Sequence, residues 1–120
     1  MRNILLICVM LLGTWNVIGQ DKNTLVHAIG YYQSLKFEES LSVFNVLIER
    51  EPENASLIGR RGYVRCQYIK AIDQKKIPAI TPERYAEVVR KGIDDLKVGL
   101  EEKPENVDNA NCLKYLQARL

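Results

Sequence analysis

The sequence is poor in the residues that carry most enzyme chemistry. It contains one histidine, His27, and no cysteine, histidine or acidic residue lies at metal-ligand spacing from it. It has no nucleophile elbow, no phosphate-binding glycine loop and no Cys–His signature. The acidic pairs Asp94-Asp95 and Glu101-Glu102 are adjacent in sequence, so their members point to different faces of a helix and make poor acid–base dyads. We therefore expect no catalytic residue, no metal site, no cofactor and no enzyme activity.

Three further absences narrow the class of protein. No segment shows sustained alternation of period two, which excludes a substantial β-sheet. No long basic tract or glycine-rich segment indicates a disordered arm. The formal net charge of +2 argues neither for nor against nucleic acid, and without a basic arm we expect no nucleic-acid partner. A hydrophobic content of 47% and a charged content of 27% over 120 residues are typical of one globular domain.

The N-terminal segment has the three-part form of a secretory signal peptide. Arg2 supplies a positive charge, residues 4–12 are an unbroken apolar run, and Val17-Ile18-Gly19 fits a cleavage site before Gln20. The run is shorter than the roughly 20 residues of a membrane span. We therefore expect a signal peptide at 1–19, a mature domain at 20–120, transient contact with the membrane, and export to the periplasm or the extracellular space. An uncleaved signal anchor and a buried core helix are the alternatives.

A short polar corner occurs twice in the chain. Glu51-Pro52-Glu53-Asn54 returns as Lys103-Pro104-Glu105-Asn106, and the likeness extends upstream at one constant offset. Proline disfavours an α conformation in the residue before it, and asparagine two residues later is a good helix N-cap. Each corner is therefore predicted to end one helix and begin another, which makes the chain a repeat of helical hairpins.

Apolar residues at helical spacing predict five helices separated by these corners and by short connectors. Asp21 or Asn23 is a candidate cap for the first helix, and Thr81 followed by Pro82 marks the start of the fourth. A loop is expected over residues 73–80. The helices are expected at residues 24–34, 37–50, 55–71, 82–102 and 107–120.

This pattern resembles tetratricopeptide repeats, which are arrays of antiparallel helix pairs about 34 residues long. The resemblance departs from the family pattern in an insertion at 73–80, in Arg65 at an aromatic position and in Ile58 at the tryptophan-like position. It implies an all-α, TPR-like α-solenoid with repeats at 24–54 and 55–106 and a capping helix at 107–120. The positions that carry it are Ala28, Tyr31, Phe37, Ser40, Phe44, Pro52, Gly62, Gly92, Leu96 and Pro104.

In the family, a peptide or partner protein lies in a concave groove lined by the first helix of each pair. The basic residues Arg60, Arg61, Arg65 and Lys70 would receive an acidic partner or form a solvated face. The alternative for the groove is that its side chains only complete a core or a self-contact. By residue-wise transfer, the groove would present Leu25, Ile29, Tyr32, Gln33, Tyr63, Cys66, Gln67, Asn111 and Tyr115.

The resemblance also places Cys66 and Cys112 on the first helices of consecutive repeats, which are neighbours in this architecture. In an oxidising compartment they are candidates for a disulfide. The alternative is a pair of buried free thiols, and it is the favoured one because cysteines in the middle of a helix often simply pack in the core. The function expected from these observations is an exported protein–protein interaction module, a scaffold or an adaptor. A structural subunit that self-associates or joins an envelope complex is the alternative.

Overall fold

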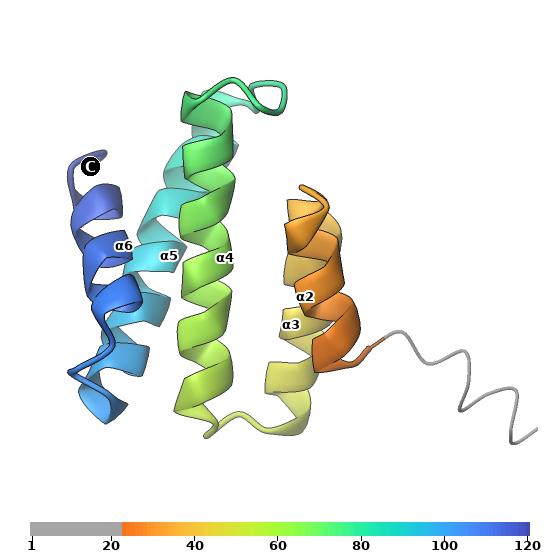
Figure 1. Cartoon of the computed structure of the whole chain (residues 1–120), viewed down its shortest axis with the longest axis vertical. Helices are drawn as coiled ribbons and strands as arrows, with labels where there is room; N and C mark the ends of the chain where they lie inside the picture. Colours follow the sequence, from red (N-terminus) through yellow and green to blue (C-terminus); the bar gives the residue numbers. More distant parts are fainter. Residues whose placement is uncertain (1–22) are drawn as a thin grey trace, which may run out of the picture.

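The computed structural model describes residues 23–120, and within this range it contains helices and no strand, which confirms the all-α class. The predicted signal segment lies outside the described residues. Figure 1 shows two layers: α2, α4 and α6 lie side by side in front, with α3 and α5 behind them. The helices are α2 (Leu25–Gln33), α3 (Phe37–Arg50), α4 (Ala55–Asp73), α5 (Pro82–Glu102) and α6 (Val107–Gln117).

The two repeated corners have the same conformation. Asn54 caps α4 by accepting a hydrogen bond from the Leu57 amide at 3.2 Å, and Asn106 caps α6 in the same way from the Asn109 amide at 3.0 Å. Their backbone angles are nearly equal, with φ −78° and ψ 91° for Asn54 and φ −72° and ψ 97° for Asn106. The repeat seen in the sequence is thus a repeat of backbone structure, as predicted.

The start of α2 corrects one prediction. Thr24, and not Asn23, is the cap, because it is the extended residue directly before the helix; Asp21 lies outside the described residues. Its hydroxyl accepts a hydrogen bond from the His27 amide at 3.3 Å and contacts His27 Nδ1 at 2.7 Å. The predicted cap of α5 is confirmed, since the Thr81 hydroxyl accepts from the Arg84 amide at 3.1 Å.

Helices α2 and α4 end with the same backbone motif. Leu35, with φ 63°, and Lys75, with φ 59°, take the left-handed conformation directly after the C-cap residue. In each case two amides return to carbonyls of the last turn, as in a Schellman motif: the Lys36 amide donates to Tyr31 at 2.8 Å, and the Lys76 amide to Ala71 at 2.9 Å. Helix α4 ends at Asp73, two residues beyond its predicted end, and α6 ends at Gln117, three residues before its predicted end at Leu120.

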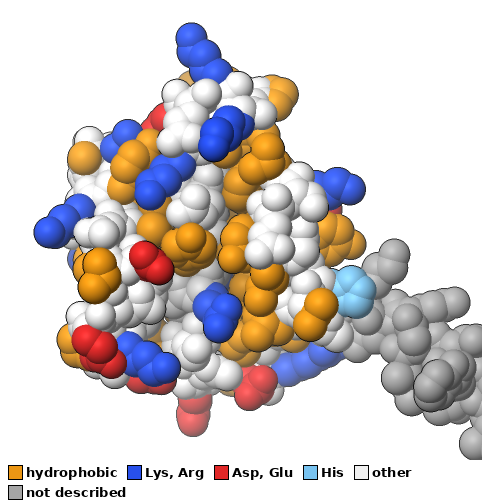
Figure 2. Space-filling model, viewed as in Figure 1, with side chains coloured by type: hydrophobic (Ala, Val, Ile, Leu, Met, Phe, Trp, Pro, Cys, Tyr) orange, Lys and Arg blue, Asp and Glu red, His pale blue; other side chains and the backbone are white. Residues whose placement is uncertain are grey.

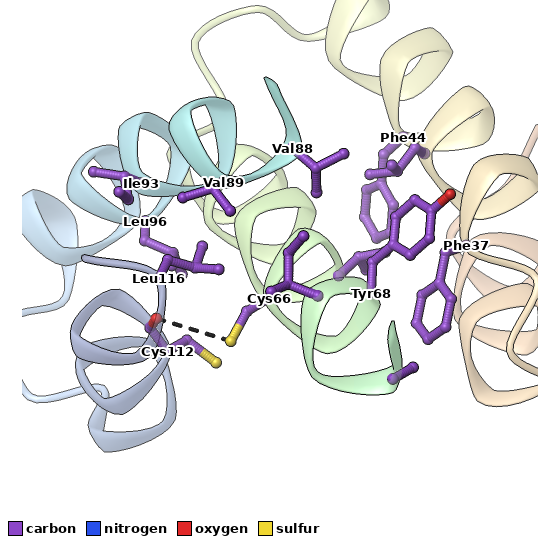
Figure 3. Packing of buried hydrophobic residues seen from close by; sticks show 14 of the residues in the cluster. Phe37, Phe44, Cys66, Tyr68, Val88, Val89, Ile93, Leu96, Cys112 and Leu116 are labelled. Carbon is purple, nitrogen blue, oxygen red and sulfur yellow. Dashed lines mark hydrogen bonds between the residues drawn. The ribbon is translucent and has the colours of Figure 1, made fainter. Parts of the chain in front are cut away.

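The two layers meet in a continuous apolar core. Phe37 on α3 stacks on Tyr68 of α4, with ring centroids 5.1 Å apart and planes 8° from parallel. Figure 3 shows this pair on one side of the core, Leu96, Cys112 and Leu116 on the other, and Cys66 between them. Small residues let the first two helices cross closely: Ser40 and Ala28 are fully buried, and the Ser40 hydroxyl donates to the Ala28 carbonyl at 2.7 Å.

Glycines bring α4 and α5 together. A Cβ on Gly62 would lie 2.8 Å from Asp95 Cβ and 2.9 Å from the Leu96 amide nitrogen, which is closer than side chains pack. About one helical turn away, Gly59 faces Gly99. Gly92, on α5, makes room for Leu116 of α6, since a Cβ there would lie 2.6 Å from Leu116 Cδ1. Gly62 and Gly92 therefore lie at close contacts between helices.

Candidate interaction surface

The layer formed by α2, α4 and α6 carries two hollows. The upper hollow lies between α2 and α4, near the 74–80 loop, and has a volume of about 380 Å³. The lower hollow lies over the first half of α4, between α2 and α6, and has a volume of about 360 Å³. The upper hollow is lined by Tyr32, Gln33, Leu35, Phe37, Tyr63, Gln67, Lys70, Ala71, Gln74 and Lys76. The lower hollow is lined by Tyr32, Ala55, Ser56, Gly59, Arg60, Tyr63, Gly99, Glu102, Lys103, Asn106, Asp108 and Asn109.

Tyr32 and Tyr63 line both hollows and separate them. Their rings meet edge to face, with centroids 6.1 Å apart and planes at 79°. Burial and the neighbouring Tyr32 raise the pKa of the Tyr63 hydroxyl, so the side chain is neutral over the physiological range. A half-buried neutral tyrosine offers both apolar area and a hydrogen-bonding group, a combination common in interfaces.

The two hollows differ in charge. The lining of the upper hollow includes Lys70 and Lys76 and no acidic residue. The lower hollow is balanced, because Arg60 and Lys103 line it together with Glu102 and Asp108. In Figure 2, which views this face, acidic side chains gather at the lower end and basic side chains predominate at the upper end.

Tyr115, a predicted groove residue, is committed to an internal contact. Its hydroxyl bonds Asp73 Oδ2 at 2.5 Å, and the Arg119 guanidinium lies 3.4 Å from the centre of its ring. The same carboxylate accepts a hydrogen bond from Tyr85 at 2.8 Å and from Arg119 Nε at 2.7 Å. Asp73 therefore ties the end of α4 to the start of α5 and the end of α6, and Tyr115 contributes to the fold rather than to either hollow.

Two of the four basic residues assigned to an acidic partner form ion pairs behind this face. Arg61 makes a bidentate ion pair with Asp95 on α5, at 2.8 and 2.9 Å, and Arg65 donates to the same carboxylate. Arg65 and Asp95 are 6% and 5% exposed, so neither can reach a partner. Burial lowers the pKa of Arg65, and Asp95 opposes that effect by favouring the charged form. Arg65 therefore cannot receive an acidic partner, and Arg61 is already paired with Asp95, while Arg60 and Lys70 remain at the hollows.

The structure brings together four of the predicted groove residues: Tyr32, Gln33, Tyr63 and Gln67 all line the upper hollow. Leu25 packs against the core cluster, and Asn111 is exposed on α6. Neither these two nor Ile29 lines a hollow.

Cys66 and Cys112 are buried free thiols in the structure. The Cys66 thiol donates to the Cys112 carbonyl at 3.8 Å, and Figure 3 shows the two sulfur atoms on facing sides of α4 and α6. The Cys112 thiol and burial together raise the pKa of Cys66, which makes it a poor nucleophile. Cys66 belongs to the core rather than to the groove.

Sequence reasoning missed several hollow residues. Phe37 and Leu35 come from the α2–α3 connection, which a groove built from first helices alone does not include. Asn109 and Lys103 line the lower hollow from α6 and from the second corner. A signal for Asn109 was present, since helical spacing from Leu113 and Leu116 places it on the same side of the last helix as these two apolar residues.

Within residues 23–120, no cluster of three or more metal-binding side chains is present, and no helix is long and apolar enough to cross a membrane. Comparison of the chain with protein-family models, curated proteins and solved structures found no match.

Proposed function

We propose that this chain is a small, exported protein–protein interaction module of the tetratricopeptide type, which binds a peptide or partner protein on the face formed by α2, α4 and α6. The observation that carries the proposal is the pair of hollows that meet at Tyr32 and Tyr63. Grooves of this size, lined by aromatic side chains and a few polar groups, are typical of ligand sites.

Three further observations support the repeat assignment. The helices alternate between a front and a back layer, as hairpin repeats do (Figure 1). The corners at Asn54 and Asn106 have one conformation. Ser40 against Ala28, and Gly62 against Leu96, provide the close helix contacts that such repeats need. The chain contains two and a half repeats, which is near the minimum for a stable array, and the polar back of α6 suits a capping helix.

Site-specific photocrosslinking tests the binding face. A photoreactive amino acid replaces Gln33 or Gln67, which line the upper hollow without filling the core. The matched control is the same replacement at Asn45, which is exposed on α3 in the back layer. We expect a discrete adduct from the two front positions in cells of the source organism and none from Asn45. Adducts from Asn45 alone, or from no position, would contradict the proposal.

Self-assembly is the second candidate, and exposed apolar side chains at both ends of the helix array favour it. Val26 on α2 is 78% exposed, and Val107 and Leu120 at the other end are 67% and 79% exposed. An end-to-end contact between copies would cover these residues and extend the array. Light scattering of the purified mature chain distinguishes the two functions: a monomer supports an adaptor, and a concentration-independent oligomer supports a structural subunit.

Export rests on the sequence of the N-terminal segment. N-terminal sequencing of the protein recovered outside the cytoplasm tests it: we expect a start at Gln20, and Met1 would show that the segment is retained.

A further inference from the structure

The upper hollow combines several apolar side chains with two positive charges. Tyr32, Leu35 and Tyr63 supply apolar surface beside the buried Phe37, and Lys70 and Lys76 are the charged lining residues. No ion pair engages either lysine within the described part of the chain. Lys70 lies 5.1 Å over the ring of Tyr115, a contact that leaves its ammonium charge unneutralised.

The carboxylate nearest to these lysines in sequence, that of Asp73, does not pair with them. Asp73 is three residues from Lys70 and from Lys76, yet both of its oxygens bond other groups, namely the hydroxyls of Tyr85 and Tyr115 and Arg119 Nε. Arg119 already balances its charge. The positive charges of Lys70 and Lys76 at the upper hollow are therefore available to a ligand.

Two backbone positions with unfavourable conformations flank the same hollow. Leu35 and Lys75 occupy the left-handed position after a helix, where glycine is preferred and other residues cost roughly 1 kcal/mol or more. Leu35 is 43% exposed and lines the hollow, and Lys75 lies between the lining residues Gln74 and Lys76. Residues with strained backbone conformations cluster at ligand sites.

We propose that the upper hollow selects an acidic peptide segment of the partner, with a large apolar side chain against Tyr32, Tyr63 and Leu35 and one or more carboxylates against Lys70 and Lys76. This inference rests on the proposed function and names the chemistry of the ligand. A volume of about 380 Å³ accommodates one large side chain with its adjoining backbone. A peptide fits better than a nucleic acid, because the apolar lining residues outnumber the two charges and no basic stripe continues beyond them.

Selection from a phage-displayed library of random 12-residue peptides tests the proposal. The full mature chain is the target, beside two charge-reversed variants with the same change in net charge. One is Lys70→Glu/Lys76→Glu in the upper hollow, and the other is Arg90→Glu/Lys97→Glu on exposed positions of α5. Circular dichroism and thermal unfolding establish that each variant is folded before selection.

We expect peptides enriched in Asp and Glu beside an aromatic or large aliphatic residue. For a synthetic peptide from that selection, fluorescence anisotropy should give a Kd that rises about tenfold or more in Lys70→Glu/Lys76→Glu at 50 mM salt. The Kd should stay within about twofold of the unmodified chain in Arg90→Glu/Lys97→Glu, and binding to the unmodified chain should weaken with added salt.

The outcomes separate this inference from the proposed function. Peptides without an acidic excess that lose binding in Tyr63→Ala would overturn the acidic specificity and leave the interaction module standing. An absence of enriched peptides, together with no crosslinked adduct at Gln67, would overturn both. A fluorescent 20-nucleotide single strand that displaces the selected peptide with higher affinity would replace the peptide by a nucleic acid as the ligand.

Discussion

Gly59 and Gly99 face each other across the contact between α4 and α5, with no side chain between the two backbones. A Cβ on Gly99 would lie 2.8 Å from the Cα of Gly59, and a Cβ on Gly59 would lie 3.0 Å from the Cα of Gly99. Both residues also line the lower hollow, so the closest approach of the two helices forms part of its floor.

Gly99→Ala should therefore lower the free energy of unfolding, because backbone rather than a flexible side chain must move. We expect a loss of about 1–2 kcal/mol after the helix preference of alanine is included. Gly30→Ala is the control, since a Cβ at this exposed position on α2 meets nothing within 4 Å. That variant should gain about 0.5–1 kcal/mol. Urea unfolding measures both, and equal effects in the two variants would refute the close contact.

Asp95→Asn should be among the most damaging single substitutions. It leaves Arg65 buried and Arg61 without its bidentate partner, and breaking a buried ion pair from one side costs about 3 kcal/mol or more. The neighbouring Asp94→Asn is the control: Asp94 is exposed, and its replacement should change stability by no more than about 0.5 kcal/mol. A small loss in Asp95→Asn would mean that the ion pair adds little to folding.

Asp73 should make the free energy of unfolding depend on pH in the acidic range. Burial raises its pKa, but hydrogen bonds from Tyr115, Arg119 and Tyr85 outweigh that effect and lower it. A carboxylate with a lowered folded pKa stabilises the fold above its unfolded pKa of about 3.9, and this contribution disappears as pH falls through the folded value. Thermal unfolding from pH 6 to pH 2 should show a shallower acid decline in Asp73→Asn than in the unmodified chain. Parallel curves would exclude this role.

Replacing the left-handed residues by glycine should separate stability from binding. Lys75→Gly and Leu35→Gly should each stabilise the fold by about 0.5–1 kcal/mol, because glycine adopts φ near 60° without strain. Only Leu35→Gly removes a side chain that lines the upper hollow, so only that variant should lose affinity for the selected acidic peptide. Calorimetry and anisotropy on the same samples test both effects, and equal losses of affinity would remove Leu35 from the site.

The buried thiols should resist modification until the fold opens. In a purified chain that begins at Gln20, a thiol reagent such as dithionitrobenzoate should find no reactive group under native conditions and two after denaturation without reductant, because Cys66 and Cys112 are free and buried. No reactive group after denaturation would show that the purified protein carries the disulfide instead.

The sequence was sufficient to predict where α4, α5 and α6 begin and where α3 and α5 end. Proline and asparagine at the corners, and Thr81-Pro82 before α5, act within a few residues, so local chemistry determines those limits. Ser40 and Gly62, two of the positions that carry the family resemblance, both lie where two helices approach closely.

The partners of the charged residues could not be predicted in this way. Arg65 meets Asp95, and Tyr115 meets Asp73, only because α4, α5 and α6 pack together, and these pairs are separated by 30 and 42 residues. A helical pattern shows which apolar residues flank Arg65 and Tyr115 on their own helices. It does not show which residue of a neighbouring helix lies opposite them. Two predicted surface roles were therefore internal contacts in the structure.

Helix α2 is short and packs chiefly on α3, where Ala28 is its fully enclosed side chain. Nine residues are fewer than an isolated helix needs to persist in water, so its order depends on the crossing of Ala28 with Ser40 and on the edge-to-face contact of Tyr32 with Tyr63. Helix α2, on one side of the upper hollow, is thus less firmly held in place than α4 on the other side. A ligand that contacts both α2 and α4 would hold α2 in place, and the protein would therefore be more rigid with ligand bound than without it.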